Sequence, residues 1–209
     1  MKLTPHELPS LGYQLLDKLH HQELVPFLQT YLKKKTKYSI FYYAINIFIF
    51  GFTGYLFMAG YGKPGFSFGD RFVHFSYGLA IAFALVPLHE YIHALAYKAQ
   101  GAKNTSYDAN LKKFYFMALA DQFVASKREF LFVALAPFVC ISTLLIVPIC
   151  FTHANWPLSF SAALLAHTSM CAGDFGLLSY FAFHKDKELV TYDDVSAKIS
   201  YFYGRDIEK

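Results

Sequence analysis

Four long apolar runs divide the chain, and polar segments separate them. Residues 38–60 contain no charged side chain, and further apolar runs cover residues 72–96, 130–151 and 158–183. A helix of about 20 predominantly apolar residues is long enough to cross the hydrocarbon core of a bilayer. The pattern therefore predicts an all-α polytopic membrane protein with about four transmembrane helices within residues 38–183.

The two ends of the chain are more polar than these runs. In residues 10–35, apolar residues are interspersed with Lys, His, Gln and Glu, which favours one or two amphipathic helices interrupted near Pro26. Such helices can lie on the membrane surface or form a small cytosolic cap. We therefore expect an amphipathic cytoplasmic segment over residues 1–37, a transmembrane domain over 38–183 and a cytoplasmic tail over 184–209.

The longest polar segment between the runs, residues 97–129, has signals of its own. Residues 113–118 are rich in β-favouring side chains, and residues 105–107 are a candidate for an earlier strand. Together the two stretches would form a small β-hairpin in this loop. Ser126 and Glu129 have the spacing of a capping box, which predicts that the next helix begins here.

Composition and charge agree with a membrane protein. The chain has 209 residues, of which 55% are hydrophobic and 16% are charged, whereas soluble domains have about 25% charged residues. The net charge of +4 is modest, and no basic stripe points to nucleic acid as a partner. Lys and Arg are concentrated before the first run, in residues 97–129 and after the fourth run. By the positive-inside rule, both termini and this loop are expected in the cytoplasm.

The second apolar run contains the strongest chemical signal, the H-E-x-x-H sequence from His89 to His93. Residues four apart share one face of a helix, so His89 and His93 can bind one metal ion. Glu90 lies close enough to act as a general base on a metal-activated water. Pro87 predicts a break in the hydrogen bonding of this helix. The alternative is a pair of histidines satisfied by hydrogen bonds in a buried helix.

A carboxylate in the fourth run extends this candidate site. Glu90 and Asp174 are the only carboxylates in the four runs. His89 is 17 residues from the start of its run at residue 72, and Asp174 is 16 residues from residue 158. Since these two helices would run in the same direction, the two side chains would reach nearly the same depth. Asp174 could then be the third protein ligand, with a fourth position left for water. A hydrogen-bonded carboxylate without a metal is the alternative.

Other polar or reactive side chains in the runs are less specific. His167 lies seven residues before Asp174, on the same face of the predicted helix. It is a candidate for orienting a metal ligand or for contacting the substrate, and it fits equally well as a buried histidine bonded to a carbonyl. Three cysteines fall in apolar stretches with no C-x-x-C pair, so we interpret them as small core residues rather than a disulfide framework: Cys140, Cys150 and Cys171.

With these motifs, residues 72–183 resemble the site-2 protease class of intramembrane zinc metalloproteases, in particular its compact, PDZ-free bacterial group of zincin peptidases. The resemblance rests on the H-E-x-x-H sequence in an apolar helix and on Gly101 shortly after it. It also rests on residues 135–138, Leu-Ala-Pro-Phe, after a Lys-Arg-Glu helix start, and on Gly173-Asp174 in the last run. Many members have Asp-Gly where this chain has Asp174-Phe175, and an asparagine is often found near the position of His167.

The resemblance implies a function and a ligand set. His89, His93 and Asp174 would bind Zn²⁺, and Glu90 would be the general base of a zinc metallopeptidase. Its substrates would be membrane-associated proteins or peptides, cleaved in or near a bacterial cytoplasmic membrane. A helical peptide bond is shielded, so a substrate would unwind, and the hairpin over residues 105–118 could then pair with it by strand addition.

Two other functions fit parts of this pattern. A metal-ion transporter would need further polar residues along a path, and the outer halves of the four runs contain few. A non-catalytic membrane scaffold, or pseudoprotease, could keep the metal ligands, but a purely structural site would not need Glu90. The lipid bilayer is an expected partner, and no feature of the sequence predicts an oligomeric state.

Overall fold

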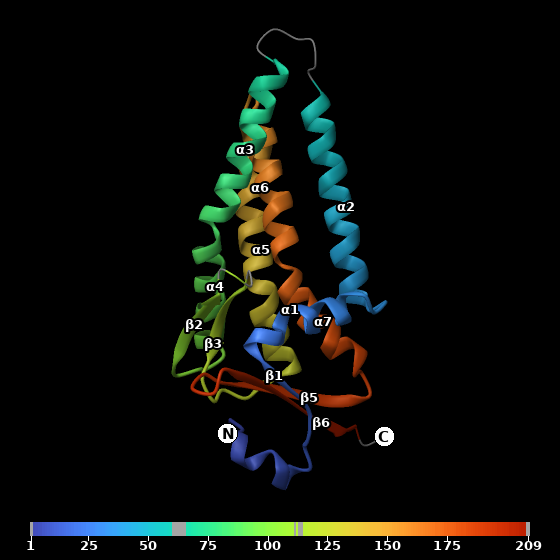
Figure 1. Cartoon of the computed structure of the whole chain (residues 1–209), viewed down its shortest axis with the longest axis vertical. Coiled ribbons are helices and arrows are strands. Elements are labelled where there is room, and N and C mark those ends of the chain that lie inside the picture. Colours follow the sequence, from blue (N-terminus) through green and yellow to red (C-terminus); the bar gives the residue numbers. More distant parts are fainter. Residues whose placement is uncertain (1, 60–65, 111, 113–114, 208–209) are drawn as a thin grey trace. The chain divides into compact units, whose positions relative to one another are not determined.

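The computed structural model describes residues 2–59, 66–110, 112 and 115–207 (Figure 1). Its α-helices are α1 (Leu24–Leu32), α2 (Lys37–Met58), α3 (Phe68–Ala84), α4 (Val86–Ala99), α5 (Lys127–Phe151), α6 (Trp156–Met170) and α7 (Ala172–Phe183). Its strands are β1 (Gln14–His20), β2 (Thr105–Asn110), β3 (Tyr115–Ala120), β4 (Ala125–Ser126), β5 (Lys187–Asp194) and β6 (Ile199–Asp206). Short 3-10 helices cover Pro5–Glu7, Pro9–Leu11 and His21–Glu23.

The prediction of an all-α protein is wrong, because the chain forms a mixed α/β fold. One antiparallel sheet has the strand order β1-β6-β5-β4, and a second consists of β2 and β3. β1 replaces the first half of the helical segment predicted over residues 10–35, and only α1 follows that prediction. β5 and β6 form in the predicted tail. The reason is pairing between distant segments: β1 bonds to β6, so the two ends of the chain complete one sheet.

The loop between the second and third runs folds as predicted. β2 and β3 pair as an antiparallel hairpin in which Thr105 faces Ala120 and Asn110 faces Tyr115. The predicted strand over residues 113–118 begins at Tyr115, and residues 113 and 114 lie outside the described residues. The Ser126 backbone N–H donates to a carboxylate oxygen of Glu129 at 2.9 Å, which confirms the capping box at the start of α5.

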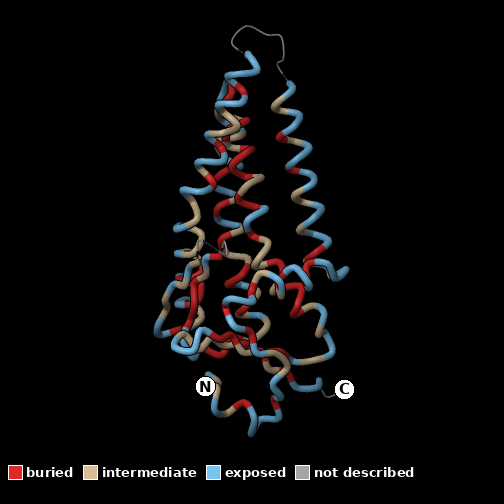
Figure 2. The backbone as a smooth tube through the Cα atoms, in the orientation of Figure 1, coloured by how far each residue is buried: buried red, intermediate tan, exposed pale blue. Residues whose placement is uncertain are grey.

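Within the described residues, three helical stretches are long and apolar enough to cross a membrane: Lys37–Met58, Phe68–Ala99 and Lys127–Phe151. Figure 2 shows the exposed residues along α2, as expected for a helix that faces lipid. A single fourth transmembrane helix is not found. The fourth apolar run forms two shorter helices, α6 and α7, because the backbone of Cys171 leaves helical geometry between them (φ −69°, ψ 7°).

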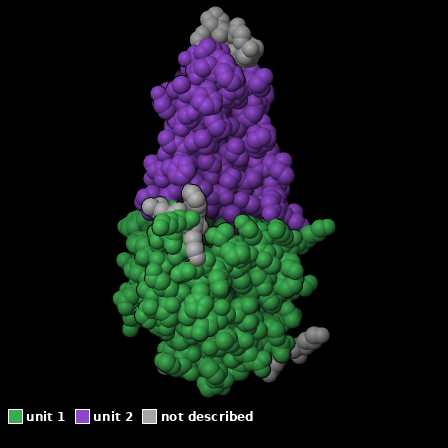
Figure 3. Space-filling model, viewed as in Figure 1, with its two compact units in different colours: residues 1–39, 90–136, 173–209 green, residues 40–89, 137–172 purple. Residues whose placement is uncertain are grey.

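The chain divides into two compact units (Figure 3). Unit 1 comprises residues 1–39, 90–136 and 173–209, and it contains both sheets. Unit 2 comprises residues 40–89 and 137–172, and it is helical.

Unit 2 is held together by a close helix crossing and by buried hydrogen bonds. Gly78 of α3 lies against the backbone of α6, where a side chain would collide with Ser159 and Ala163. α2 bonds to α6 through polar side chains: the hydroxyls of Thr53 and Ser161 lie 2.7 Å apart. Small residues and side-chain hydrogen bonds are common in helix contacts within membranes, where lipid is as apolar as the helix surface.

The core of unit 1 packs helices against the larger sheet through aromatic rings. Phe27 of α1 stacks on Phe202 of β6, with ring centroids 5.8 Å apart. Tyr180 of α7 is fully buried, with its ring centroid 4.8 Å from that of Phe202. The Tyr180 hydroxyl donates to a carboxylate oxygen of Asp17 in β1 at 2.7 Å. α1 is therefore fixed to this sheet by packing, and α7 by packing and a hydrogen bond.

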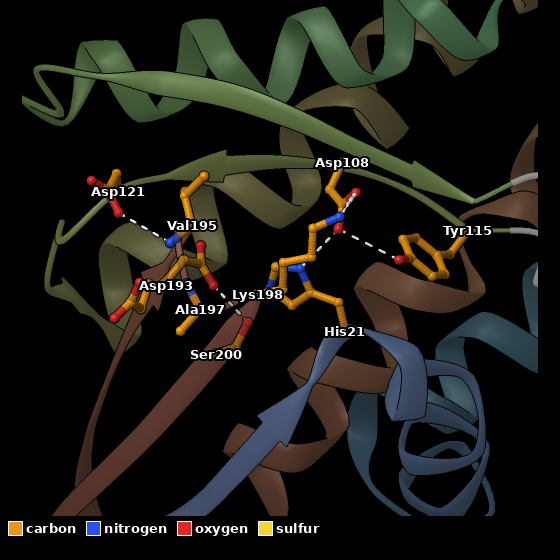
Figure 4. Close-up of polar contacts among 10 residues, drawn as sticks. His21, Asp108, Tyr115, Asp121, Asp193, Val195, Ala197, Lys198 and Ser200 are labelled. Carbon is orange, nitrogen blue, oxygen red and sulfur yellow. Dashed lines mark hydrogen bonds and ion pairs between the residues drawn. The ribbon is translucent and has the colours of Figure 1, made fainter.

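A polar cluster around Asp108 connects the β2–β3 hairpin to the larger sheet (Figure 4). His21 Nδ1 lies 3.0 Å from Asp108 Oδ2, and Lys198 Nζ lies 3.2 Å from Asp108 Oδ1. The Tyr115 hydroxyl donates to Asp108 Oδ2 at 3.4 Å. Partial burial opposes ionisation of Asp108, but the hydrogen bonds and charges of His21 and Lys198 outweigh it and lower the pKa of this carboxyl.

Asp108 should therefore make the stability of the protein depend on pH. A carboxyl group with a lowered pKa in the folded state stabilises the fold above its unfolded pKa, and this contribution is lost as the pH falls through the folded pKa. We expect Asp108→Asn to lower the free energy of unfolding by about 1–3 kcal/mol at pH 7. Unfolding of the detergent-solubilised protein from pH 7 to pH 3 should show a smaller decline for Asp108→Asn than for wild type. Parallel pH curves would contradict this role.

Candidate metal centre

The helix that carries the H-E-x-x-H sequence begins at a break. α3 ends at Ala84 and α4 begins at Val86, with Leu85 between them, two residues before Pro87. The break confirms the effect predicted for this proline, which cannot donate a backbone hydrogen bond. α4 then continues as one helix to Ala99, and His89 N–H donates to the Leu85 carbonyl at 2.9 Å. The four-residue spacing therefore places His89 and His93 on one face of α4.

In unit 1, His93 of α4 faces Asp174 in the first turn of α7. His93 Nε2 lies 3.1 Å from Asp174 Oδ1, and His93 Nδ1 lies 3.0 Å from the Val133 carbonyl of α5. His93 is 8% exposed. A carbonyl oxygen only accepts hydrogen bonds, so Nδ1 carries a proton and donates it. Nε2 and the carboxylate oxygen of Asp174 can then approach this closely only with a proton or a cation between them.

In unit 2, His89 lies beside two side chains at the end of α6. His89 Nδ1 is 3.3 Å from His167 Nε2, and the two ring centroids are 5.5 Å apart. Cys171 Sγ is 3.9 Å from His167 Nε2, and both of these residues are buried. Each of His89, His167 and Cys171 offers one atom that could bind a metal, and these three atoms all lie within 4.8 Å of one another.

Glu90 follows His89 directly on α4 and belongs to unit 1. Its side chain is half-buried, and one carboxylate oxygen, Oε2, is inaccessible to solvent. On a helix, Glu90 is rotated about 100° from His89. A carboxylate here is partly shielded from water and lies next to the histidine pair in the chain, which suits proton transfer.

The three cysteines differ from one another in the structure, and one of them contacts a histidine of this region. The prediction of small core residues is wrong for Cys140 and Cys150, which are exposed. Cys171 is a buried core residue as predicted, but its thiol also lies next to His167. The available signal was the four-residue spacing of His167 and Cys171, which places both on one face of a helix. Among the predicted residues, the structure brings His93 together with Asp174, and His89 together with His167.

Comparison with known proteins identifies the family. The family model described as "Putative zincin peptidase" matches residues 82–189, about half of the chain. The chain belongs to this family. The matched residues include α4 with its H-E-x-x-H sequence and extend through α7 to the start of β5. Neither the search of curated proteins nor the search of solved structures found a match. Membership of a zincin family indicates a metallopeptidase that uses zinc.

Proposed function

We propose that this protein is an intramembrane zinc peptidase that cleaves membrane-associated proteins or peptides. In this proposal His89, His93 and Asp174 bind the zinc ion and Glu90 is the general base. The observation that carries the proposal is the contact of His93 with Asp174. His93 Nδ1 is held by a hydrogen bond to the Val133 carbonyl, and His93 Nε2 lies 3.1 Å from Asp174 Oδ1.

The residues present fit a zinc ion. Two histidines and one carboxylate are a ligand set of catalytic zinc sites. Two ligand atoms about 2.0–2.1 Å from a tetrahedral zinc ion lie about 3.3 Å apart, close to the 3.1 Å between His93 Nε2 and Asp174 Oδ1. Metal-binding histidines usually donate their other ring N–H to a carbonyl or carboxylate. The hydrogen bond from His93 Nδ1 to Val133 is of this kind.

The side chains of this chain would divide the catalytic work. Zinc, when bound, supplies a Lewis acid that lowers the pKa of a water molecule. Glu90 would accept the proton of that water and pass it to the amine of the leaving peptide. If His89 binds through Nε2, its Nδ1 carries a proton and donates to His167 Nε2, 3.3 Å away. His167 would then orient the His89 ring, one of the two roles predicted for it.

The intramembrane location rests on the apolar helices. The H-E-x-x-H sequence lies in the Phe68–Ala99 stretch, one of the three that are long and apolar enough to cross a bilayer. We propose an integral protein of a bacterial cytoplasmic membrane, with both termini in the cytoplasm according to the distribution of Lys and Arg. The resemblance to site-2 proteases points in the same direction.

The β2–β3 hairpin is the proposed binding element for an extended substrate. β2 and β3 pair only with each other among the described strands, so each has an outer edge that could bond to a further strand. Side chains alternate between two faces, and Tyr107 and Phe116 are exposed while Asp108 contacts His21 and Lys198, which lie directly after β1 and directly before β6. The Asp108 cluster would therefore hold the hairpin in place while one of its edges accepts the substrate backbone.

Zinc content tests this proposal. After dialysis of the purified protein against a weak chelator, we expect about one zinc ion per chain in wild type and in Glu90→Gln. His93→Ala and Asp174→Asn should lose the ion under the same conditions when each is combined with Cys171→Ser, which removes the nearby thiol as an alternative ligand. Cys171→Ser alone should retain the ion. His153→Ala changes an exposed histidine outside the site and should retain it. Folded protein without stoichiometric zinc in any variant would favour the non-catalytic scaffold.

A further inference from the structure

Unit 2 contains a second group of side chains with the character of metal ligands. In a tetrahedral site with bonds of about 2.05 Å to nitrogen and about 2.3 Å to sulfur, two nitrogens lie about 3.3 Å apart and nitrogen and sulfur about 3.6 Å apart. The corresponding distances are 3.3 Å between His89 Nδ1 and His167 Nε2, and 3.9 Å between His167 Nε2 and Cys171 Sγ. The three side chains thus approach the geometry of a bound ion.

We propose that His89, His167 and Cys171 form a second, thiolate-containing metal position that accepts a soft divalent cation such as Zn²⁺, Cd²⁺ or Co²⁺. The local backbone prepares it, since Cys171 N–H donates to the His167 carbonyl at 3.2 Å and extends the last turn of α6. Cys171 is 0% exposed and His167 is 2% exposed. A thiolate at such a buried position needs a cation beside it.

Binding at this position exchanges a proton for the metal ion. The S–H bond of Cys171 breaks, the proton goes to the buffer, and a bond forms between sulfur and the cation, with no change in oxidation state. One proton is released per ion, so occupancy should increase with pH. Thiophilic cations should be favoured over Mg²⁺ or Ca²⁺, which prefer oxygen ligands.

The second position competes with the catalytic one through His89, a step that rests on the proposed function. A neutral imidazole offers one unprotonated nitrogen to a metal. If His89 binds through Nδ1 beside His167, its Nε2 carries the proton and cannot bind the catalytic zinc. A chain should therefore hold an ion at one position or the other, and a thiophilic cation at the second position would withdraw His89 from the catalytic site.

Cobalt spectroscopy tests the second position. In His93→Ala, where the proposed catalytic position is disabled, Co²⁺ titration should produce an intense thiolate-to-cobalt charge-transfer band. The band should be lost in His93→Ala/Cys171→Ser and retained in His93→Ala/Cys140→Ser, which removes an exposed cysteine instead. A band that survives the loss of Cys171, or no band in His93→Ala, would overturn the proposal.

A second measurement avoids changes at the metal ligands. Cys140→Ser/Cys150→Ser leaves Cys171 as the only thiol of the chain. X-ray absorption of this protein loaded with excess Cd²⁺ should show one sulfur neighbour, and a shell of only nitrogen and oxygen would refute the thiolate position. The two proposals can fail separately, because zinc retention in Cys171→Ser that does not depend on His93 or Asp174 would contradict the catalytic site and leave the sulfur signal of the Cys171-only protein unaffected.

Discussion

Replacing Glu90 by glutamine should abolish peptide-bond cleavage while the protein keeps its fold and its zinc ion. Glutamine has nearly the shape of glutamate but cannot accept a proton at neutral pH, and general-base catalysis typically contributes about 10²–10⁴-fold to the rate. Glu90 lies one residue after His89 on α4 and is half-buried. The same substitution at Glu23, an exposed carboxylate outside the motif, should leave the rate unchanged.

The measurement should count new amino termini formed when the purified protein acts on a library of apolar membrane-spanning peptides in detergent. Wild type and Glu23→Gln should generate the same termini, and Glu90→Gln should generate at least about 100-fold fewer. Equal cleavage by Glu90→Gln and wild type would show that another group accepts the proton. Zinc content measured on the same samples separates a lost base from a lost ion.

The sequence predicts the parts of the molecule that depend on local periodicity and composition. The apolar runs form helices close to the predicted limits, as in α2 and α5. The capping box at Ser126, the break before His89 and the β2–β3 hairpin are also local signals, and the structure confirms them. Each involves residues that are close together in the chain, so one segment contains the whole signal.

The larger sheet could not be found in this way, because its pairing is not local. Gln14 of β1 pairs with Gly204 of β6, although almost the entire sequence lies between these two residues. Asp17 and Lys18 lie within β1, and charged residues of this kind favour neither a strand nor burial. The charged residues of β5 likewise make residues 187–194 resemble a soluble tail. The sheet also explains why the polar N-terminal segment does not form two amphipathic helices.

The candidate site was predicted in part, because some of its contacts follow from local signals and others depend on the folded backbone. The depth argument placed Asp174 near the histidines, and the contact of His93 with Asp174 is present, although the fourth run is not one continuous helix. Their roles as ligands stay a prediction. The position of Cys171 depends on the end of α6, where backbone geometry changes within one residue, and composition alone does not indicate such a change.

A methyl group at Gly78 should destabilise unit 2 more than any other alanine substitution at a glycine of its helices. A Cβ atom there would lie less than 3.0 Å from three atoms of α6: Ser159 O, Ala162 Cβ and Ala163 N. Two of these are backbone atoms, so the clash cannot be relieved by rotating a side chain. α3 would have to move away from α6, at a cost of about 1–3 kcal/mol or more.

Gly54 of α2 provides the matched control, because a Cβ atom at this position meets nothing within 4 Å. Gly54→Ala should leave the stability unchanged or raise it by up to about 1 kcal/mol, since alanine favours the helix more than glycine does. Thermal unfolding in detergent should therefore give a lower Tm for Gly78→Ala and an equal or higher Tm for Gly54→Ala. Equal Tm values for the two variants would mean that α3 and α6 do not cross as closely as Gly78 requires. Because His89 follows α3 by five residues and His167 belongs to α6, loosening this crossing should also weaken the cobalt band of the thiolate position.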